Sequence, residues 1–261
     1  MILPWYARLA LRVIAALALV ILYGPLLLTI FLSFFDVGRG GVQWQSFGLH
    51  WYAALLHNRG IIEALGNTLL VGAATVVCAL VLGTLIAFWY QAHPGRLRSV
   101  LQAIVFLPFM LPPIMTGLSL LIFFREAGIP RSLVTVTIGH TVFVLALVYQ
   151  IVGARLRSLS PSLIEASYDL GGDAPRTFRY VLLPHLASAM ATAAVLAFAL
   201  SFDETLITLL VTGTESTLPL RLWAMMRTGF TPDINALVAL ILVGSIAVCA
   251  VCAVVARLIR V

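Results

Sequence analysis

The sequence contains no lysine, and it carries few charges of either sign. All 16 basic residues are arginine, 10 residues are acidic, and charged residues make up 10% of the 261 positions. Without lysine the chain cannot form a nucleotide-binding P-loop, because that motif uses a lysine to reach the β- and γ-phosphates. We therefore expect that this polypeptide does not bind and hydrolyse ATP through a P-loop of its own.

Cysteine is also scarce, and the three that occur, Cys78, Cys249 and Cys252, indicate no disulfide framework. Cys249 and Cys252 have the CxxC spacing of a metal or redox pair. Both lie inside the apolar run "LVALILVGSIAVCAVCAVVA", with no histidine or second cysteine pair nearby. We interpret this pair as small apolar residues of a membrane helix.

Apolar residues are abundant. Hydrophobic residues make up 62% of the chain and the mean hydropathy is +1.08, whereas an ordinary soluble domain is about 45–50% apolar and about 25% charged. This composition indicates a polytopic membrane protein. The net charge of +6 does not indicate nucleic-acid binding, because the arginines lie between the apolar runs, where they set membrane orientation.

Six apolar runs reach the length of about 20 residues that a membrane helix needs. They lie at roughly Val13–Phe35, Thr68–Tyr90, Val100–Phe124, Ser132–Val152, Leu186–Val211 and Ile234–Ala256. We predict an all-α fold, a transmembrane bundle of about six spans that forms one domain over residues 1–261. The first run is interpreted as an uncleaved helix, because it continues past Tyr23 without a signal-peptidase site before a polar start.

Arginine is unevenly distributed between the two sets of connecting segments. Ten arginines lie at the two termini and in the links after spans two and four: Arg8, Arg12, Arg96, Arg98, Arg155, Arg157, Arg176, Arg179, Arg257 and Arg260. The alternate segments hold six: Arg39, Arg59, Arg125, Arg131, Arg221 and Arg227. Because arginine accumulates on the cytoplasmic side, both termini and the link after span four are predicted to be cytoplasmic.

Two segments on the opposite side are long enough to carry structure. "DVGRGGVQWQSFGLHWYAALLHNRGIIEAL" is rich in Trp, Tyr and His. "TGTESTLPLRLWAMMRTGFTPD" places Leu222, Trp223, Met226 and Phe230 on one helical face, which predicts a short interfacial or re-entrant helix. Span three contains Pro108, Pro112 and Pro113, which should kink or break it, either as a packing irregularity or as part of a gate.

The stretch "SPSLIEASYDLGGDAPRTFRYVLLP", residues 160–184, is the most polar link between two apolar runs. Ser160 and Pro161 fit a helix N-cap and first position, and Gly171-Gly172 fits a helix stop. Asp173 fits the cap of a second short helix that continues to Pro184. The residues predict two short helices around a glycine hinge, suited to docking into a groove of another protein. A well-capped connector that binds nothing is the alternative.

The spacing within this stretch is similar to the EAA loop of ABC importer permeases. Glu165-Ala166-Ser167, three residues, Gly171, nine residues, Val181, one residue and Leu183-Pro184 match the family pattern E-A-A, three residues, G, nine residues, I, one residue, L-P. The sequence departs from the pattern at Ser167, which replaces alanine, and at Val181, which replaces isoleucine. The resemblance extends from "NTLLVGAATVVCALVLGTLIAF" to the C-terminus.

The resemblance implies a membrane transport subunit of the bacterial inner membrane rather than an enzyme. The loop would form a coupling helix that sits in a cleft of a separate ATP-binding subunit. The coupling residues would then be Glu165, Ala166, Ser167, Gly171, Val181, Leu183 and Pro184. The implied partners are a pair of ATPase subunits that bind ATP and Mg²⁺, a second homologous permease, membrane lipid and an extracytoplasmic solute-binding protein. This chain itself would bind no cofactor and no nucleic acid.

Two adjacent acids, Asp203 and Glu204, lie within the fifth apolar run. Acids at membrane depth are costly and mark transport pathways, although an interfacial pair bonded to Arg221 or to backbone is the alternative. The carboxylates and the rings of Phe198 and Phe202 would attract a cationic amine. The segment around them resembles the second permease of spermidine/putrescine importers, which makes a polyamine the expected solute.

Other functions are open at this stage. Related importers move other small solutes, including aminophosphonate, thiamine or ferric iron. An ion-coupled secondary transporter could use Asp203 and Glu204 as a proton relay, but it would leave the EAA stretch without a purpose. A membrane-embedded enzyme is disfavoured because the five histidines form no HExxH or other metal-ligand spacing: His50, His57, His93, His140 and His185.

Overall fold

The structure is a computed structural model that describes residues 4–38, 40–93, 95–228 and 232–259. It divides into two compact parts. The first part comprises Met1–Ile61 and Leu222–Ala250, and the second comprises Ile62–Arg221 and Val251–Val261. The prediction of a single domain stays a prediction.

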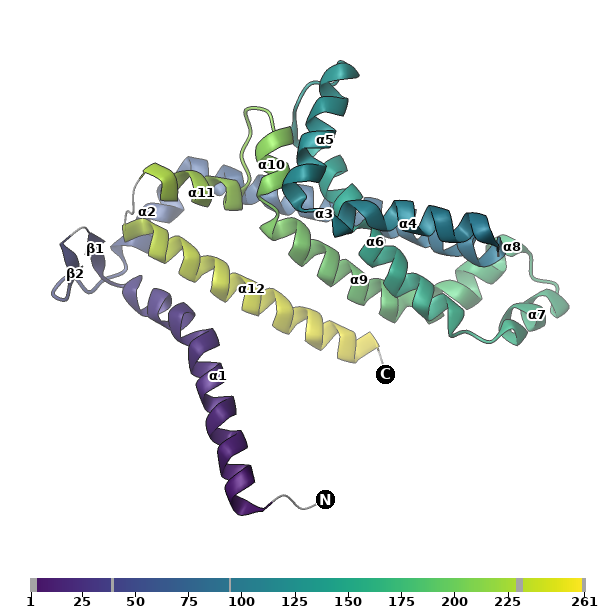
Figure 1. Ribbon diagram of the computed structural model, residues 1–261, viewed down its shortest axis with the longest axis horizontal. Coiled ribbons are helices and arrows are strands. Elements are labelled where there is room, and N and C mark those ends of the chain that lie inside the picture. Colours follow the sequence, from purple (N-terminus) through teal and green to yellow (C-terminus); the bar gives the residue numbers. More distant parts are fainter. Residues whose placement is uncertain (1–3, 39, 94, 229–231, 260–261) are drawn as a thin grey trace. The chain divides into compact units, whose positions relative to one another are not determined.

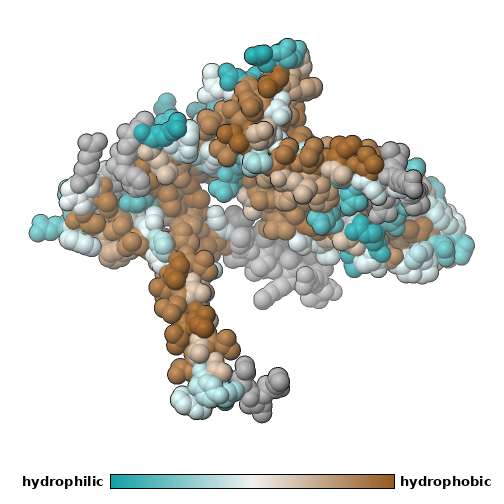
Figure 2. Space-filling view, in the orientation of Figure 1, coloured by the Kyte–Doolittle hydropathy of each residue, from teal (hydrophilic) through white to brown (hydrophobic). Residues whose placement is uncertain are grey.

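The first part begins with α1 (Trp5–Leu32), a helix with no buried residue. Figure 2 shows apolar side chains along most of its length. A helix that exposes so many large apolar side chains is stable only in contact with lipid or with another protein. The last long helix of the chain, α12 (Pro232–Ile259), carries Cys249 and Cys252, whose side chains lie outside the described part.

The aromatic-rich segment after α1 contains a small hairpin that the sequence did not predict. Strands β1 (Asp36–Gly38) and β2 (Gly41–Gln43) pair antiparallel, and α2 (His50–His57) follows. The Asp36 carboxylate accepts hydrogen bonds from Trp51 Nε1 at 2.6 Å and His50 Nε2 at 2.9 Å. These bonds hold α2 against the hairpin.

The helix expected near Trp223 is present as α11 (Leu218–Thr228). The Arg227 guanidinium lies over the Trp223 ring, with 4.2 Å between its carbon and the ring centroid. Phe230, which was assigned to the same face, lies outside the described residues.

The second part is built around the pairing of α6 (Leu133–Arg157) with α9 (Leu183–Asp203), flanked by α3 (Arg59–Ala92) and α4 (Arg96–Met110). Its core contains Ala79, Ala87, Tyr90, Val144, Val148, Tyr149, Val152, Leu186, Ala193 and Ala197. Small residues bring the helices close: a Cβ on Gly83 of α3 would lie 2.9 Å from Val148 of α6. Figure 1 shows α7 (Pro161–Asp169) and α8 (Ala174–Arg176) at one end of α9, and α10 (Leu206–Val211) at the other.

The third apolar run is broken rather than continuous. Helix α4 and helix α5 (Pro113–Glu126) are bent by 105° where Leu111 and Pro112 separate them. Pro112 has no N–H for the carbonyl of Pro108, and the Thr116 hydroxyl donates to that carbonyl instead, at 3.3 Å. The third apolar run is therefore a bent pair of helices, and the predicted break at the prolines is confirmed.

The other spans differ from prediction chiefly at their ends. Helices α1, α3, α6 and α12 cover most of the predicted first, second, fourth and sixth runs. The fifth run was predicted to end at Val211, but α9 ends at Asp203 and α10 is separate. Among the described residues, four helices are long and apolar enough to cross a membrane, or five if the bent α4–α5 pair counts as one span. With α12 in addition, the prediction of about six spans is consistent with the fold.

Candidate functional site

The 160–184 segment forms an ordered helix, turn and helix. Ser160 occupies the N-cap position of α7 and Pro161 its first turn, as predicted, although the Ser160 side chain forms no capping hydrogen bond. Helix α7 has no buried residue, and the side chains of Glu165 and Ala166 are exposed. The motif's acid is therefore free to meet another molecule.

The glycine pair ends α7 with a Schellman motif. Gly171 has a φ of +78°, and its N–H donates to the Tyr168 carbonyl at 2.8 Å. The Gly172 N–H donates to the Ser167 carbonyl at 2.9 Å, where a Cβ on Gly172 would lie only 2.7 Å from that oxygen. The predicted helix stop at Gly171-Gly172 is thus confirmed: Gly171 is required by its positive φ and Gly172 by this close approach.

Two side-chain hydrogen bonds lock the turn. Ser167 Oγ lies 2.8 Å from the hydroxyl oxygen of Thr177, which is buried. The Asp173 carboxylate accepts from the Arg176 N–H at 2.9 Å and so caps α8, as predicted. The serine that departs from the family's alanine thus supplies a contact that alanine cannot make.

The second helix of the segment is not short, which corrects the prediction that it stops at Pro184. Helix α8, the π-helical turn η1 (Thr177–Leu182) and α9 form one helix over Ala174–Asp203. Pro184 cannot donate to the carbonyl of Tyr180, and the wider turn before it uses bonds such as Leu183 N–H to the Phe178 carbonyl. A displacement of α8 would therefore be transmitted directly into α9.

The remaining motif residues differ in exposure. Val181 and Leu183 are half-buried, and Pro184 is exposed. The Arg155 guanidinium donates from Nε to the His185 carbonyl at 3.0 Å, which ties the end of α6 to the first turn of α9. The motif thus joins an exposed helix to the two central helices of the second part.

Apolar side chains accompany Glu165 on the surface of this segment. Leu170 is 90% exposed, Tyr168 is 50% exposed and Tyr180 is 71% exposed. We call Glu165, Tyr168 and Leu170 the coupling surface. An exposed leucine and tyrosine beside an acid, on a turn held by two hydrogen bonds, have the composition of a protein-docking surface.

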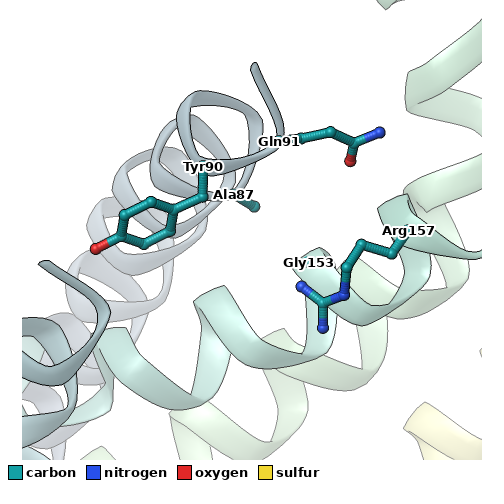
Figure 3. Close-up of a pocket in the computed structure, with 5 residues that line it drawn as sticks. All are labelled: Ala87, Tyr90, Gln91, Gly153 and Arg157. Carbon is teal, nitrogen blue, oxygen red and sulfur yellow. The ribbon is translucent and has the colours of Figure 1, made fainter. Parts of the chain in front are cut away.

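A small cavity lies between the neighbouring ends of α3 and α6. It has a volume of about 50 Å³ and is lined by Ala87, Tyr90, Gln91, Gly153 and Arg157. In Figure 3 the Arg157 side chain folds back beside Gly153, opposite α3. A Cβ on Gly153 would lie 3.2 Å from Arg157 Nη1. The cavity has room for only a few water molecules and is too small for a solute.

The two acids predicted for the pathway lie at the break between α9 and α10 and have different environments. Asp203 is the last residue of α9 and its side chain is exposed. Glu204 is 8% exposed, and its Oε1 accepts from the N–H groups of Leu206 at 2.9 Å and Ile207 at 3.0 Å. Glu204 therefore caps α10, which leaves Asp203 as the available carboxylate.

The two phenylalanines predicted beside these acids are neighbours on α9. Their ring centroids are 6.0 Å apart and both side chains are half-buried. Phe198 packs against α3, since a Cβ on Gly72 would lie 2.8 Å from its ring. Among the described residues, the three ion pairs do not include Asp203 or Arg221, and no cluster of three His, Cys, Asp or Glu side chains is suited to a metal ion.

A bundle of long apolar helices, with an ordered and exposed helix, turn and helix at one end of α9, is the organisation of a polytopic membrane protein. The chain belongs to the family described as binding-protein-dependent transport system inner membrane component, whose profile matches residues 79–261. The match covers more than half of the chain and includes the complete 160–184 segment, so the resemblance seen in the sequence is confirmed.

Relatives with known roles cover nearly the whole chain. The spermidine/putrescine transport system permease protein PotC of Escherichia coli is 30% identical over 237 residues, which are 90% of this chain and 89% of that protein. The putrescine transport system permease protein PotI of Escherichia coli is 33% identical over 239 residues, with 88% and 84% covered. PotC of Haemophilus influenzae is 28% identical, with 90% and 92% covered.

Solved transporters share the fold. A bacterial ABC transporter involved in the import of the acidic polysaccharide alginate aligns over 98% of this chain and 95% of its own, with a TM-score of 0.76 and 14% identity. The MetNI methionine ABC transporter in an inward-facing conformation aligns over 80% and 98%, with a TM-score of 0.64 and 22% identity. These similarities confirm the predicted class of fold.

Proposed function

We propose that this chain is the permease subunit of an ATP-driven importer of polyamines. The observation that carries the coupling role is that the coupling surface is continuous, through a locked turn, with α9. ATP-driven closure of a partner ATPase pair would move α7, and the single helix from Ala174 to Asp203 would pass that motion along the membrane span. ATP and Mg²⁺ would be bound by the ATPase subunits.

The polyamine assignment rests on the relatives and on Asp203. PotC and PotI are named as permeases for spermidine/putrescine and putrescine, and each matches about nine-tenths of this chain. Asp203 lies about 28 Å along the helix from Pro184, at 1.5 Å per residue. It would therefore meet a solute near the side of the membrane opposite the ATPase. A carboxylate with the half-buried ring of Phe202 beside it suits a cationic amine.

The proposal also implies an orientation of the chain in the membrane and a set of partner proteins. The coupling surface and both termini would face the cytoplasm, as the arginine distribution predicts. A second homologous permease would complete the pathway, and a solute-binding protein would deliver the polyamine from outside. ATP hydrolysis would be the task of the ATPase pair rather than of this chain.

The test is uptake of labelled spermidine and putrescine into proteoliposomes that contain this chain, its co-encoded permease and the ATPase pair. The solute-binding protein is added outside, with and without ATP on the ATPase side. We expect accumulation that requires ATP and does not follow an imposed proton gradient. ATP hydrolysis without polyamine uptake would direct the search to aminophosphonate, thiamine or ferric iron. Uptake driven by the proton gradient alone would instead establish a secondary transporter.

A further inference from the structure

The break between α9 and α10 is bridged by a buried histidine on a third helix. His140 of α6 is 1% exposed, and both of its ring nitrogens are engaged. Nδ1 lies 2.8 Å from the hydroxyl of Ser201 in the last turn of α9, and Nε2 lies 2.9 Å from the hydroxyl of Thr208 in α10. One side chain therefore spans the point where the fifth run is interrupted.

The neighbouring bonds determine which nitrogen carries the proton. Thr208 Oγ1 donates to the Glu204 carbonyl at 2.8 Å, so it can only accept from His140. His140 Nε2 is thus the donor, and Nδ1 of the neutral ring accepts from the Ser201 hydroxyl. The result is a directed chain of hydrogen bonds from Ser201 through His140 and Thr208 to Glu204.

Helix α10 is held firmly by its neighbours, so it can fix one end of this series of hydrogen bonds. A Cβ on Gly139 of α6 would lie 2.7 Å from Ile207 Cγ2, and one on Gly117 of α5 would lie 3.1 Å from Ile207 Cα. Thr135 Oγ1 of α6 donates to the Val211 carbonyl at 2.7 Å. Packing around Ile207 and the Thr135 bond to Val211 thus hold both ends of α10 against α5 and α6, while His140 joins α10 to α9.

We propose that His140 is a positioning residue that holds the α9–α10 break in one geometry and thereby sets where the Asp203 carboxylate meets a cationic solute. Asp203 lies two residues after Ser201 and one before the Glu204 cap, so the bonded residues enclose it on both sides. The inference rests on the proposed function in one respect, namely that Asp203 contacts the solute.

The substitution His140→Leu tests this, because it removes both bonds without stranding a buried donor. The Ser201 hydroxyl can turn to the Ala197 carbonyl one turn back, and Thr208 keeps its bond to Glu204. His140→Gln is the conservative variant, since its amide can donate to Thr208 and accept from Ser201. Thr141→Val is the matched control, because the Thr141 hydroxyl donates only to the Thr137 carbonyl of its own helix.

The readout is the amount of putrescine imported per ATP hydrolysed in the reconstituted complex, at saturating solute-binding protein. We expect His140→Leu to lower this ratio about tenfold or more, as for a misplaced ionic contact, with the rate of ATP hydrolysis retained. His140→Gln should restore most of the ratio, and Thr141→Val should leave it unchanged. When Asp203→Asn is already present, His140→Leu should cause little further loss of putrescine imported per ATP, because His140 acts through the Asp203 carboxylate.

Several results would overturn the inference. One is that His140→Leu imports as much putrescine per ATP hydrolysed as the wild type. Another is that His140→Leu lowers uptake and ATP hydrolysis in parallel. A third is that His140→Leu lowers the putrescine imported per ATP by its full factor even when Asp203→Asn is present. If His140→Leu does not assemble, Ser201→Ala removes only the hydrogen bond between His140 and α9. A wild-type amount of putrescine imported per ATP in Ser201→Ala would also overturn the inference.

A second measurement separates this inference from the choice of solute. If the wild-type complex imports no polyamine, the proposed function fails. Spin labels at the exposed Leu196 of α9 and Leu209 of α10, in a variant whose three cysteines are replaced by alanine, then report on the break. A distance distribution that broadens in His140→Leu supports the positioning role, and an unchanged distribution rejects it.

Discussion

Ser167 Oγ lies 2.8 Å from Thr177 Oγ1, and this hydrogen bond connects α7 to the first turn of the helix that becomes α9. The family pattern has alanine at position 167, which cannot form this bond. The contact crosses the glycine turn, so it couples the orientation of the coupling surface to the orientation of the membrane helix.

Replacing Ser167 with alanine should loosen this connection. The Thr177 hydroxyl would lose its partner at a buried position, which typically costs about 1 kcal/mol. We expect a lower thermal unfolding midpoint for the purified complex and fewer solute molecules imported per ATP. Ser162→Ala is the control, because Ser162 bonds only to exposed Ser160. An unchanged midpoint in Ser167→Ala would show that the bond contributes nothing.

Reversing the charge of Glu165 should weaken the association with the ATPase. Its side chain is exposed on α7, so Glu165→Arg should leave membrane insertion and the fold of the permease intact. The measurement is co-purification of the ATPase with a tagged permease. Glu126→Arg makes the same change on α5, which lies outside the 160–184 segment, and should have no effect. Equal recovery of the ATPase with Glu165→Arg and with wild type would remove Glu165 from the docking role.

Replacement of either glycine of the turn by alanine should lower stability more than the same replacement of an exposed helical glycine. Gly171→Ala forces alanine into a φ of +78°, at a cost of about 1 kcal/mol. Gly172→Ala should be worse, since the new Cβ would lie 2.7 Å from the Ser167 carbonyl oxygen. Both should lower the unfolding midpoint of the complex, whereas Gly66→Ala, in α3 with open space around it, should not. Three equal midpoints would contradict the assigned turn geometry.

Substitutions of Asp203 and of Glu204 should have different effects, the first on transport and the second on folding. Asp203→Asn should reduce polyamine uptake with little change in complex assembly, because its carboxylate supports no other described group. Glu204→Ala should destabilise the permease by about 1–3 kcal/mol, since the N–H groups of Leu206 and Ile207 lose their acceptor. Glu204→Gln keeps an oxygen that can accept the two N–H bonds and should assemble normally.

The matched measurements are uptake, assembly yield and unfolding midpoint for all three variants. From the sequence alone, Asp203→Asn and Glu204→Gln are each expected to impair uptake more than assembly. Equal uptake in both variants and wild type would remove both acids from the pathway. Loss of assembly in Asp203→Asn would instead assign Asp203 a structural role.

Several features follow from the order of residues alone. The apolar runs act through length and composition, and the prolines of the third run and the caps at Ser160 and Asp173 act within about one helical turn. Local backbone geometry and the need to bury or expose apolar surface are encoded by neighbouring residues, so the membrane class and the helix, turn and helix of the 160–184 segment were predictable, whereas the family followed from the resemblance of the EAA spacing.

Other features required the tertiary structure, because they depend on residues far apart in the chain. The end of α9 at Asp203 is not marked by proline or glycine. Its position is defined by Glu204 capping α10 and by bonds from His140 on α6, 61 residues before Ser201. The need for Gly117 and Gly139 is likewise visible only where α10 packs between α5 and α6. The sequence by itself determined the long apolar helices and the helix, turn and helix of the 160–184 segment. Only tertiary packing decided which of two adjacent acids is structural and which is free, because hydrogen-bond partners are chosen in space.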